Sequence, residues 1–501
     1  MSECWKEQSR EIEPEQIDPV APPCEVELEL TRACNLRCPH CWAAGGQPAA
    51  SELSTDAWLR IIRELGDMGV MSVVLSGGEP FMRRDLLQLA RGSTEAGLST
   101  VISCTGWHVT DQVAQELAAL GGIGVSISLD GPRELHDRFR QVPGAFDHAI
   151  SAIRVLSRAG ISVGATFMVT ELSAGNFRET AALAAEAGAR VMSVGQCGTF
   201  GRSSLELALS WDRWQEFICT VTDQAKAGEL PLPVRGVWTG GWQLYLPLED
   251  RLADAFSPSV WRKPPEVTPD CGMCAAGSLA CGIDPEGYLY PCATMSSYPR
   301  LRCGSVADEG FSAVWQRSRL LHHVRSLDYR ELHPCAGCSV GTLCHAGCIA
   351  CTFGLTGQLH RPDPRCPRVA GEGAATADLA APQIPSGEPY LLPLTALARE
   401  TVEGQGSDYL EILGAGRRFL RYPRTVVAVA PGGVYVYLNR SALSMLREVA
   451  LAETQGAAVH AIAQRFQISE ERARTDLAWL LNELAHNGFL PLPAVGRFLN
   501  E

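Results

Sequence analysis

The sequence has 501 residues, enough for roughly two to four domains, and its hydrophobic fraction of 46% is sufficient for full cores. The formal net charge of −13 argues against a nucleic-acid binder, because no basic surface is available to displace counterions from phosphates. No apolar run is long enough to cross a membrane, and residues 1–18 lack the apolar core of a signal peptide. With 19 cysteines and no sign of secretion, the protein is expected to bind metals or clusters in a reducing cytoplasm.

Three cysteines follow a strand-like segment at 25–30 with the spacing CxxxCxxC, namely Cys34, Cys38 and Cys41. Thiolates are the ligands of iron–sulfur clusters, which usually take four of them. Because this run stops at three, one iron would remain free to bind a group that is not protein. A zinc site or a redox CxxC pair are the alternatives, but zinc usually takes four ligands and no partner pair lies within about fifty residues. His40 is expected to pack or stack rather than to bind iron.

The segment from 25 to about 226 alternates short apolar runs with amphipathic stretches. The expected strands are 25–30, 72–76, 99–103, 123–129, 161–169 and 190–195. The expected helices are 55–68, 85–97, 111–120, 146–159 and 176–187. This alternation predicts a parallel sheet with crossover helices, two βα units short of an eight-stranded barrel. A flat doubly wound sheet would have the same periodicity.

Functional residues of parallel βα folds gather at the carboxyl ends of the strands. After the second expected strand come two glycines, which let the backbone approach a ligand closely, and a proline that stiffens the exit. The loops after the third and fourth strands add hydroxyl and charged side chains. The candidate site residues in these loops are Gly77, Gly78, Glu79, Pro80, Thr105, Ser128, Asp130 and Arg140. For Asp130 a simple turn is the alternative, and for Arg140 an ordinary surface position.

The CxxxCxxC run and the Gly-Gly-Glu-Pro motif about forty residues later together resemble the signature of the radical SAM enzymes. The resemblance implies an α/β fold with a partial (β/α)6 barrel. It also implies a catalytic [4Fe–4S] cluster on Cys34, Cys38 and Cys41, with S-adenosylmethionine chelating the open iron. An electron from the cluster would split the sulfonium and release a deoxyadenosyl radical.

The same resemblance implies roles for the loop residues. Residues 77–80 would receive the methionine amino group, and Ser128 and Asp130 would approach the ribose or the carboxylate of the cofactor. Arg140 would clamp the methionine carboxylate, because a guanidinium suits bidentate carboxylate binding. Arg202, after the sixth expected strand, is a weaker candidate for the same task.

A second group of cysteines between 271 and 366 includes the spacing CxxCx5CxxxC, followed by a distant cysteine. This set resembles the SPASM extension, the auxiliary-cluster domain of radical SAM peptide maturases. The resemblance implies two auxiliary [4Fe–4S] clusters, and a zinc ribbon is the alternative. One cluster would be held by Cys335, Cys338, Cys344 and Cys366. The other would be held by Cys281, Cys292 and Cys348, with Cys274 or Cys271 as its fourth ligand.

Other residues of this region receive structural assignments. Residues 283–290 are expected to form a hairpin that turns at Pro-Glu-Gly. Cys303 and Cys351 are expected to be small buried hydrophobic residues. Ala293 stands where sulfatase-maturing relatives have an aspartate base, directly after the cysteine equivalent to Cys292. That difference argues against sulfatase maturation.

Residues 370–389 are small and polar and are expected to form a linker. Beyond them the sequence predicts strands at 417–422, 425–430 and 433–438, then helices at 440–453, 457–466 and 469–487. A winged-helix DNA binder has this pattern, but the acidic charge disfavours it. Residues 435–490 instead resemble the PqqD-like element that grips leader peptides by strand addition.

These observations divide the chain into an N-terminal segment (1–24), a radical SAM barrel (25–228), a SPASM domain (229–369), the linker and a PqqD-like domain (390–501). The resemblances imply a cytoplasmic, oxygen-sensitive enzyme that crosslinks or oxidises a ribosomally made precursor peptide recruited by its leader. A flavodoxin- or ferredoxin-type protein would supply electrons. One alternative is the same chemistry on a tetrapyrrole or on a protein target. The other is a non-enzymatic metal-binding scaffold with a DNA-binding module.

Overall fold

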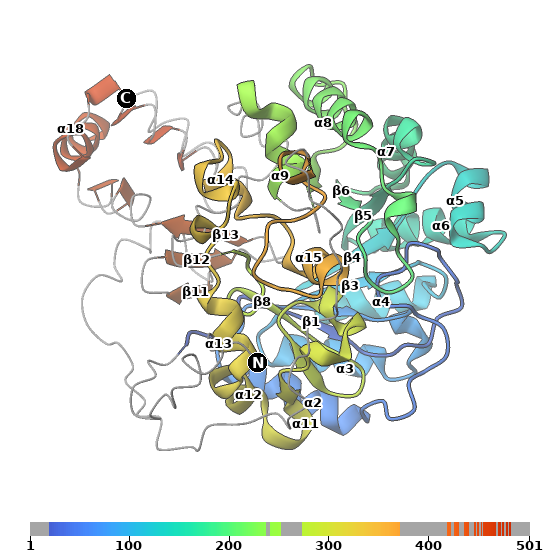
Figure 1. The fold of residues 1–501 in the computed structure, drawn as a ribbon. Helices are drawn as coiled ribbons and strands as arrows, with labels where there is room; N and C mark the ends of the chain where they lie inside the picture. Colours follow the sequence, from blue (N-terminus) through green and yellow to red (C-terminus); the bar gives the residue numbers. More distant parts are fainter. Residues whose placement is uncertain are drawn as a thin grey trace.

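The computed structural model describes residues 20–236, 241–251 and 273–370, together with parts of 418–481. Within these residues a ten-stranded sheet forms the centre of the molecule (Figure 1). Its strand order is β10-β9-β8-β1-β2-β3-β4-β5-β6-β7, so β1 to β7 follow one another in chain order and pair in parallel. The bounds are β1 Glu25–Glu29, β2 Ser72–Ser76, β3 Ser99–Cys104, β4 Ile123–Ser128, β5 Ser162–Val169, β6 Val191–Gln196 and β7 Val234–Gly236.

Helices connect the parallel strands, and α5 to α8 lie along the outer side of the sheet (Figure 1). Their bounds are α2 Thr55–Asp67, α3 Leu86–Glu95, α4 Asp111–Leu120, α5 Arg133–Arg140, α6 Ala145–Arg158, α7 Phe177–Ala187 and α8 Trp211–Lys226. Ser54 and Thr110 cap α2 and α4 by accepting backbone N–H bonds from the first turn. The predicted βα alternation is therefore confirmed, and α5, α8 and β7 are additions that periodicity did not reveal.

Alternate residues of β1 face opposite sides of the sheet. Val26 and Leu28 are fully buried and belong to one hydrophobic core together with Trp58 and Ile62 of α2. Glu29 therefore lies on the other, inner face of the curved sheet, where it is completely buried. The apolar side holds the helices against the strands, whereas the inner face carries polar groups at the carboxyl ends.

The sheet continues into the segment that follows the barrel. Strand β8 (Ala280–Ile283) pairs in parallel with β1, and β9 (Tyr288–Tyr290) and β10 (Gly304–Ser305) extend the sheet with antiparallel pairs. The β8–β9 connection is the predicted hairpin, in which Asp284 accepts bonds from the backbone N–H groups of Glu286 and Tyr288. This pairing brings the auxiliary-cluster segment next to the first barrel strand.

Short helices and turns surround a second hydrophobic core in the auxiliary region. They include α9 Gly241–Tyr245, η5 Leu246–Arg251, η6 Ala293–Ser297, α11 Val306–Glu309, α12 Phe311–Arg317, α13 Arg319–Ser326, α14 Gly341–Cys344, α15 Ile349–Thr356 and α16 Pro367–Ala370. None of the helices in the part of the chain described here is long and apolar enough to cross a membrane.

A separate three-stranded antiparallel sheet lies in the C-terminal region, with β11 Arg418–Arg421, β12 Thr425–Val429 and β13 Tyr435–Asn439. It agrees with the three predicted strands. Helix α18 (Gln455–Phe466) is the second of the predicted helices, and the described parts of the first and third are helical as well. Residues 371–417, which contain almost all of the expected linker, lie outside the described residues.

Candidate active site and auxiliary metal centres

The three cysteines of the first motif lie in a loop at the carboxyl end of β1. The loop closes on itself, because Cys34 N donates to Gly46 O over 2.9 Å and Gly46 N donates to Arg32 O over 2.7 Å. Cys38 is buried, and Cys34 and Cys41 are half-buried.

The electrostatics of this loop suit thiolates that bind a positively charged group. Burial, together with the nearby charges of Glu79, Cys38 and Cys41, raises the pKa of Cys34 to about 11. Thiolates in such a place need a strong positive charge beside them, which cluster irons supply. No three cysteine, histidine or acidic side chains within the described ranges are close enough to share one ion. Since each cysteine of a cluster can bind a different iron, a cluster does not require that proximity. The three thiols therefore fit a cluster.

The Gly-Gly pair contacts the backbone of the cluster loop. Gly78 N donates to Thr31 O over 2.6 Å and Glu79 N donates to Ala33 O over 2.7 Å. A Cβ atom on Gly78 would lie 2.4 Å from Ala33 O, and Gly77 has a positive φ of 133°. In the described atoms, the glycines therefore allow their segment to lie close to the backbone between β1 and Cys34.

Glu79 is completely buried and links three segments. Its carboxylate accepts bonds from Thr105 N (2.8 Å), Thr105 Oγ1 (2.7 Å) and Phe81 N (3.1 Å). Pro80 begins the short helix η2 (Pro80–Met82) that follows it. Glu79 and Thr105 thus join the loops after β2 and β3 beside the cluster loop, which is the neighbourhood predicted for them.

Asp130 and Arg140 form a buried ion pair next to Cys38. The Asp130 carboxylate accepts bonds from Arg140 Nε (2.7 Å), Arg140 Nη2 (2.5 Å) and Met168 N (3.0 Å), and Arg140 Nη1 lies 3.6 Å from Cys38 Sγ. Burial by itself lowers the pKa of Arg140, but the charges of Asp130 and Cys38 raise it above its ordinary value. The alternatives of a simple turn and a surface arginine are therefore wrong for this pair. Ser128 ends β4 two residues before Asp130.

Two further residues fix the cluster loop. Arg202 donates from Nε to Cys38 O (3.1 Å) and from Nη1 to Gly45 O (2.7 Å), so it ties the loop after β6 to the cluster loop. His40 stacks on Phe139 with ring centroids 4.1 Å apart, in agreement with the predicted stacking role. The carbonyl contacts of Arg202 were not predictable, because they depend on two loops that are distant in the sequence.

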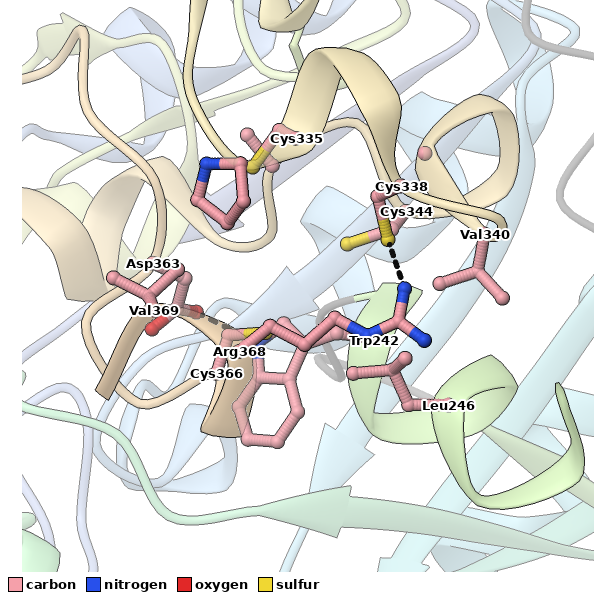
Figure 2. Close-up of a pocket in the computed structure, with 13 residues that line it drawn as sticks. Trp242, Leu246, Cys335, Cys338, Val340, Cys344, Asp363, Cys366, Arg368 and Val369 are labelled. Carbon is pink, nitrogen blue, oxygen red and sulfur yellow. Dashed lines mark hydrogen bonds between the residues drawn. The ribbon is translucent and has the colours of Figure 1, made fainter. Parts of the chain in front are cut away.

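The four cysteines expected to hold the outer auxiliary cluster line one pocket (Figure 2). They are Cys335, Cys338, Cys344 and Cys366. Burial, together with the neighbouring thiols Cys366 and Cys338, raises the pKa of Cys335 to about 11. Four thiols that line one pocket fit the coordination of an iron–sulfur cluster.

Asp363 joins this pocket to the second auxiliary site. It is buried, and its carboxylate accepts bonds from Trp242 Nε1 (3.1 Å), Cys348 N (3.2 Å) and Arg365 Nη2 (2.7 Å). The pocket wall and the backbone of Cys348 are therefore held by one carboxylate. Neither Asp363 nor Trp242 was a sequence-predicted site residue.

The cysteines assigned to the inner auxiliary cluster separate into two environments. Cys274, Cys292 and Cys348 pack against the second hydrophobic core. Cys281 lies in the core of the main sheet together with Cys303, and both are almost fully buried. Burial raises the pKa of Cys281 well above its ordinary value, and Cys303 adds to the shift. The structure thus groups Cys274 with Cys292 and Cys348, and it places Cys281 beside a cysteine that was expected to be structural.

Cys351 is buried beside Cys348, at the start of α15. The contact between the two thiols lowers the pKa of Cys348 to about 7. Cys271, one of the two expected fourth ligands, lies outside the described residues.

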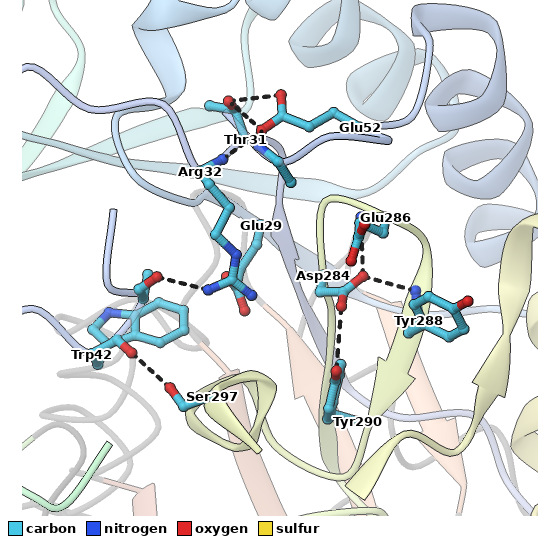
Figure 3. A network of polar contacts seen from close by, with 12 residues as sticks. Glu29, Thr31, Arg32, Trp42, Glu52, Asp284, Glu286, Tyr288, Tyr290 and Ser297 are labelled. Atoms are coloured by element: carbon cyan, nitrogen blue, oxygen red, sulfur yellow. Dashed lines mark hydrogen bonds and ion pairs between the residues drawn. The ribbon is translucent and has the colours of Figure 1, made fainter. Parts of the chain in front are cut away.

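Figure 3 shows where the catalytic loop meets the auxiliary region. Ser297 Oγ donates to Trp42 O over 2.9 Å, next to Cys41, and Arg32 Nη1 donates to Ala43 O over 2.7 Å. Glu29 lies at this junction, where the side chain of Ser296 and the guanidinium of Arg32 are its polar neighbours. The nearest cation is Arg32, whose Nη2 is 3.6 Å from Glu29 Oε2. Burial raises the pKa of Glu29 to about 7 despite the opposing charge of Arg32.

Sequence comparison supplies the family. Residues 28–184 match the model of the radical SAM superfamily, residues 274–339 that of SPASM, an iron–sulfur cluster-binding domain, and residues 422–490 that of the coenzyme PQQ synthesis protein D. The mycofactocin maturase MftC of Mycolicibacterium smegmatis is 33% identical over 74% of this chain and 88% of its own length. An AdoMet-dependent heme synthase of Oleidesulfovibrio alaskensis is 30% identical over 70% of this chain and 89% of its own.

Solved structures agree on the fold. Streptococcus suis SuiB, crystallised with the precursor peptide SuiA, superposes with a TM-score of 0.58 at 20% identity, covering 69% of this chain and 76% of SuiB. The chain belongs to the radical SAM superfamily, in the group whose barrel is followed by a SPASM domain. More specifically, it is a radical SAM/SPASM enzyme with a C-terminal PqqD-like domain, as the sequence predicted.

Membership of this family establishes the cofactors as S-adenosylmethionine, a catalytic [4Fe–4S] cluster and auxiliary clusters in the SPASM domain. The catalytic cluster, when bound, supplies the electron that cleaves S-adenosylmethionine to a deoxyadenosyl radical. The zinc alternatives and the non-enzymatic scaffold are therefore wrong.

Proposed function

We propose that the enzyme removes hydrogen from, and so crosslinks or oxidises, a ribosomally synthesised precursor peptide. The observation that carries this proposal is the PqqD match at residues 422–490, joined to a radical SAM and SPASM core. The maturase relatives support it, because their name describes modification of a precursor. The heme synthase relatives keep a tetrapyrrole substrate as the competing possibility.

The C-terminal sheet offers a place for a leader peptide. In the order β11-β12-β13, strand β13 lies at an edge of the described sheet. An extended leader adds to such an edge through backbone hydrogen bonds, and the following helices provide a wall for its side chains. Covalent attachment of this domain to the barrel raises the local concentration of the core peptide, so a weak leader contact is sufficient.

The assignment of ligands follows the grouping of the thiols. Cys34, Cys38 and Cys41 hold the catalytic cluster, and the loops with Gly77 to Pro80, Thr105, Ser128, Asp130 and Arg140 shape the cofactor site beside it. The outer auxiliary cluster is held by Cys335, Cys338, Cys344 and Cys366. For the inner cluster we assign Cys274, Cys292 and Cys348, and we move Cys281 to the hydrophobic core because it packs there with Cys303.

The proposed domains are the barrel (25–228), the SPASM region (229–369) and the PqqD-like domain (390–501). The strand pairing of β8 with β1 supports a rigid join between the first two. A flavodoxin- or ferredoxin-type protein is the proposed electron donor.

We assign proton removal to Glu29. Formation of a crosslink or a double bond removes two hydrogens from the peptide. One leaves as a hydrogen atom to the deoxyadenosyl carbon, and the other leaves as a proton, with its electron passing to an oxidised iron–sulfur cluster. Glu29 suits the proton, because it is a buried carboxylate at the junction of the catalytic loop and the auxiliary region, and burial raises its pKa to about 7. Ala293 cannot take this part, since it carries no base.

The test uses full-length anaerobic enzyme, S-adenosylmethionine, dithionite and synthetic peptides encoded by small reading frames beside the gene. Mass spectrometry should find a peptide that loses two hydrogens, and removal of residues 390–501 should abolish this turnover while uncoupled deoxyadenosine formation continues. Turnover of a porphyrin in place of any peptide, or full peptide turnover by the truncated enzyme, would overturn the proposal.

For Glu29 the matched variants are Glu29→Gln and Glu25→Gln, which alter the same face of β1 at opposite ends of the strand. With Glu29→Gln, deoxyadenosine formation on the peptide should continue while modified product falls at least tenfold, and Glu29→Asp should restore part of it. Equal product yields from both glutamine variants would contradict the assignment.

A further inference from the structure

Arg368 makes a direct contact with a ligand of the outer auxiliary cluster. It lies on α16, two residues after Cys366, and its Nη1 donates to Cys338 Sγ over 2.9 Å and to Ser339 Oγ over 3.1 Å (Figure 2). The figure shows the guanidinium reaching across the mouth of the pocket toward Cys338, away from its own neighbour Cys366.

The position of this guanidinium is fixed from the other side. Arg368 Nη2 donates to both carboxylate oxygens of Glu249, over 2.6 and 2.5 Å, and Ser339 Oγ donates to the same carboxylate. Glu249 belongs to η5, 119 residues away in the sequence. Three groups from separate segments therefore form a row: thiol sulfur, guanidinium and carboxylate. Arg368 and Glu249 are each about one third exposed, at 34% and 32%.

A row of thiol sulfur, guanidinium and carboxylate influences the reduction potential of a cluster. A reduced cluster carries one more negative charge than an oxidised one, so a hydrogen bond and a positive charge at a ligand sulfur stabilise the reduced state. A carboxylate behind the arginine opposes that effect, because its charge is negative. The transfer itself is a one-electron step in which a reductant loses an electron and the cluster gains it, with no bond formed or broken.

We propose that Arg368 raises the reduction potential of the outer auxiliary cluster, and that Glu249 both holds Arg368 in place and limits the increase. Arg368 is thus a positioning residue that acts through Cys338. A higher reduction potential makes this cluster a better acceptor for an electron that comes from the substrate. The electron would then leave the protein at the exposed surface beside Arg368. The proposal depends on the family cofactors and not on the identity of the substrate.

The test measures reduction potentials and requires no substrate. Full-length enzyme with Cys34, Cys38 and Cys41 changed to alanine is reconstituted anaerobically, so that only auxiliary clusters contribute to the signal. It is titrated with dithionite and mediators and followed by electron paramagnetic resonance. Into this background are introduced Arg368→Gln, Arg368→Lys, Glu249→Gln and the control Arg330→Gln, which removes an arginine paired with Asp328.

The proposal predicts shifts of opposite sign. With Arg368→Gln one midpoint potential moves to a more negative value, with Glu249→Gln the same midpoint moves to a less negative value, and Arg368→Lys falls between Arg368→Gln and the parent. The Arg330→Gln control leaves both midpoints unchanged. If Arg368 had only a structural role, the midpoint potentials of Arg368→Gln and Glu249→Gln would shift in the same direction, or both variants would lose iron.

Unchanged midpoints with full iron content in Arg368→Gln and Glu249→Gln would overturn the proposal, and so would shifts of the same sign. If Arg368→Gln loses iron, its midpoint potential cannot be compared with that of the parent, and Glu249→Gln becomes the deciding variant. A midpoint potential that does not rise in Glu249→Gln would then show that Arg368 has only a structural role. Failure to find a peptide substrate has no bearing on these potentials, so the two proposals fail separately.

Discussion

The loop that carries Cys34, Cys38 and Cys41 and the pocket that carries Cys335, Cys338, Cys344 and Cys366 are built in different ways. The first has three thiols, and its position is set by backbone bonds: Gly78 and Glu79 donate to carbonyls before Cys34. Arg202 donates to carbonyls within the same loop. The second has four thiols that line one pocket, and the side-chain pairs Arg368–Glu249 and Arg365–Asp363 lie beside it.

This difference matches the two tasks of a radical SAM/SPASM enzyme. In the proposed assignment, a three-thiol loop held by its main chain would leave one iron and one side of the cluster for S-adenosylmethionine. A four-thiol pocket would leave no iron open and would place charged side chains near the cluster, which influence its potential. Substitution of the glycines should therefore disturb the loop with Cys34, Cys38 and Cys41. Substitution of the charged side chains should disturb the pocket of the outer auxiliary cluster.

The largest effect should come from removing one thiol of the outer pocket. Cys344→Ala should lower the iron content of the anaerobically reconstituted protein by about four irons per chain, since a [4Fe–4S] cluster requires its ligands. The matched control is Cys281→Ala, which removes a thiol packed with Cys303 in the main core and should leave the iron content unchanged. Equal iron loss in both variants would return Cys281 to the ligand set.

A smaller effect is expected from the ion pair beside the catalytic loop. Asp130→Asn leaves Arg140 buried without its anion, and breaking such a pair costs about 3–5 kcal/mol of unfolding free energy. Denaturant unfolding of the anaerobic protein measures the loss. Asp147→Asn, which alters an exposed pair with Arg133, is the control and should change little. A comparable loss in both variants would mean that burial of the Asp130 pair has no special importance.

Next in size is the backbone contact of the first site. Gly78→Ala places a Cβ atom 2.4 Å from Ala33 O, so the strand-to-loop junction must shift, at a cost of about 1–3 kcal/mol. Deoxyadenosine formation should fall with it, because the shift moves the loop that carries Cys34. Gly175→Ala has open space around the new Cβ and serves as the control. An active and fully stable Gly78→Ala enzyme would show that the close approach is unnecessary.

The last prediction concerns pH. Burial raises the pKa of Glu29 from 4.5 to about 7, so between these values the folded protein holds a proton that the unfolded chain has lost. The contribution of Glu29 to stability is therefore most favourable below about pH 4.5 and declines as the pH rises toward 7. Glu29→Gln should lose less thermal stability than the parent between pH 5.5 and about 7.5, whereas Glu25→Gln should follow the parent. Parallel curves for all three proteins would contradict the shift.

Much of this arrangement was predictable from the sequence, because it depends on local signals. Hydrophobic periodicity placed the barrel strands within one or two residues, since one face of each strand must pack against helices. Cysteine spacing grouped the four thiols of the outer pocket correctly, because they come from short, closely spaced turns together with Cys366.

What could not be predicted depends on contacts between distant segments. The pairing of Glu249 with Arg368 joins residues 119 positions apart, and no local pattern marks either of them. Cys281 was assigned to the inner cluster by its spacing, and its place in the main core beside Cys303 follows from the pairing of β8 with β1, which no local pattern indicates. Similarly, the glycine pair was expected to let the backbone approach a ligand, whereas the close contact of Gly78 with the carbonyl of Ala33 could be found only from the fold.

The account rests most directly on the three-thiol loop being a catalytic cluster site. Anaerobically reconstituted enzyme, reduced with dithionite in the presence of S-adenosylmethionine, is assayed for 5′-deoxyadenosine beside the variant in which Cys34, Cys38 and Cys41 are alanine. The account predicts steady formation by the enzyme and none by the variant, with the auxiliary iron retained in both. Absence of 5′-deoxyadenosine from the fully iron-loaded enzyme, or equal amounts from the variant, would contradict it.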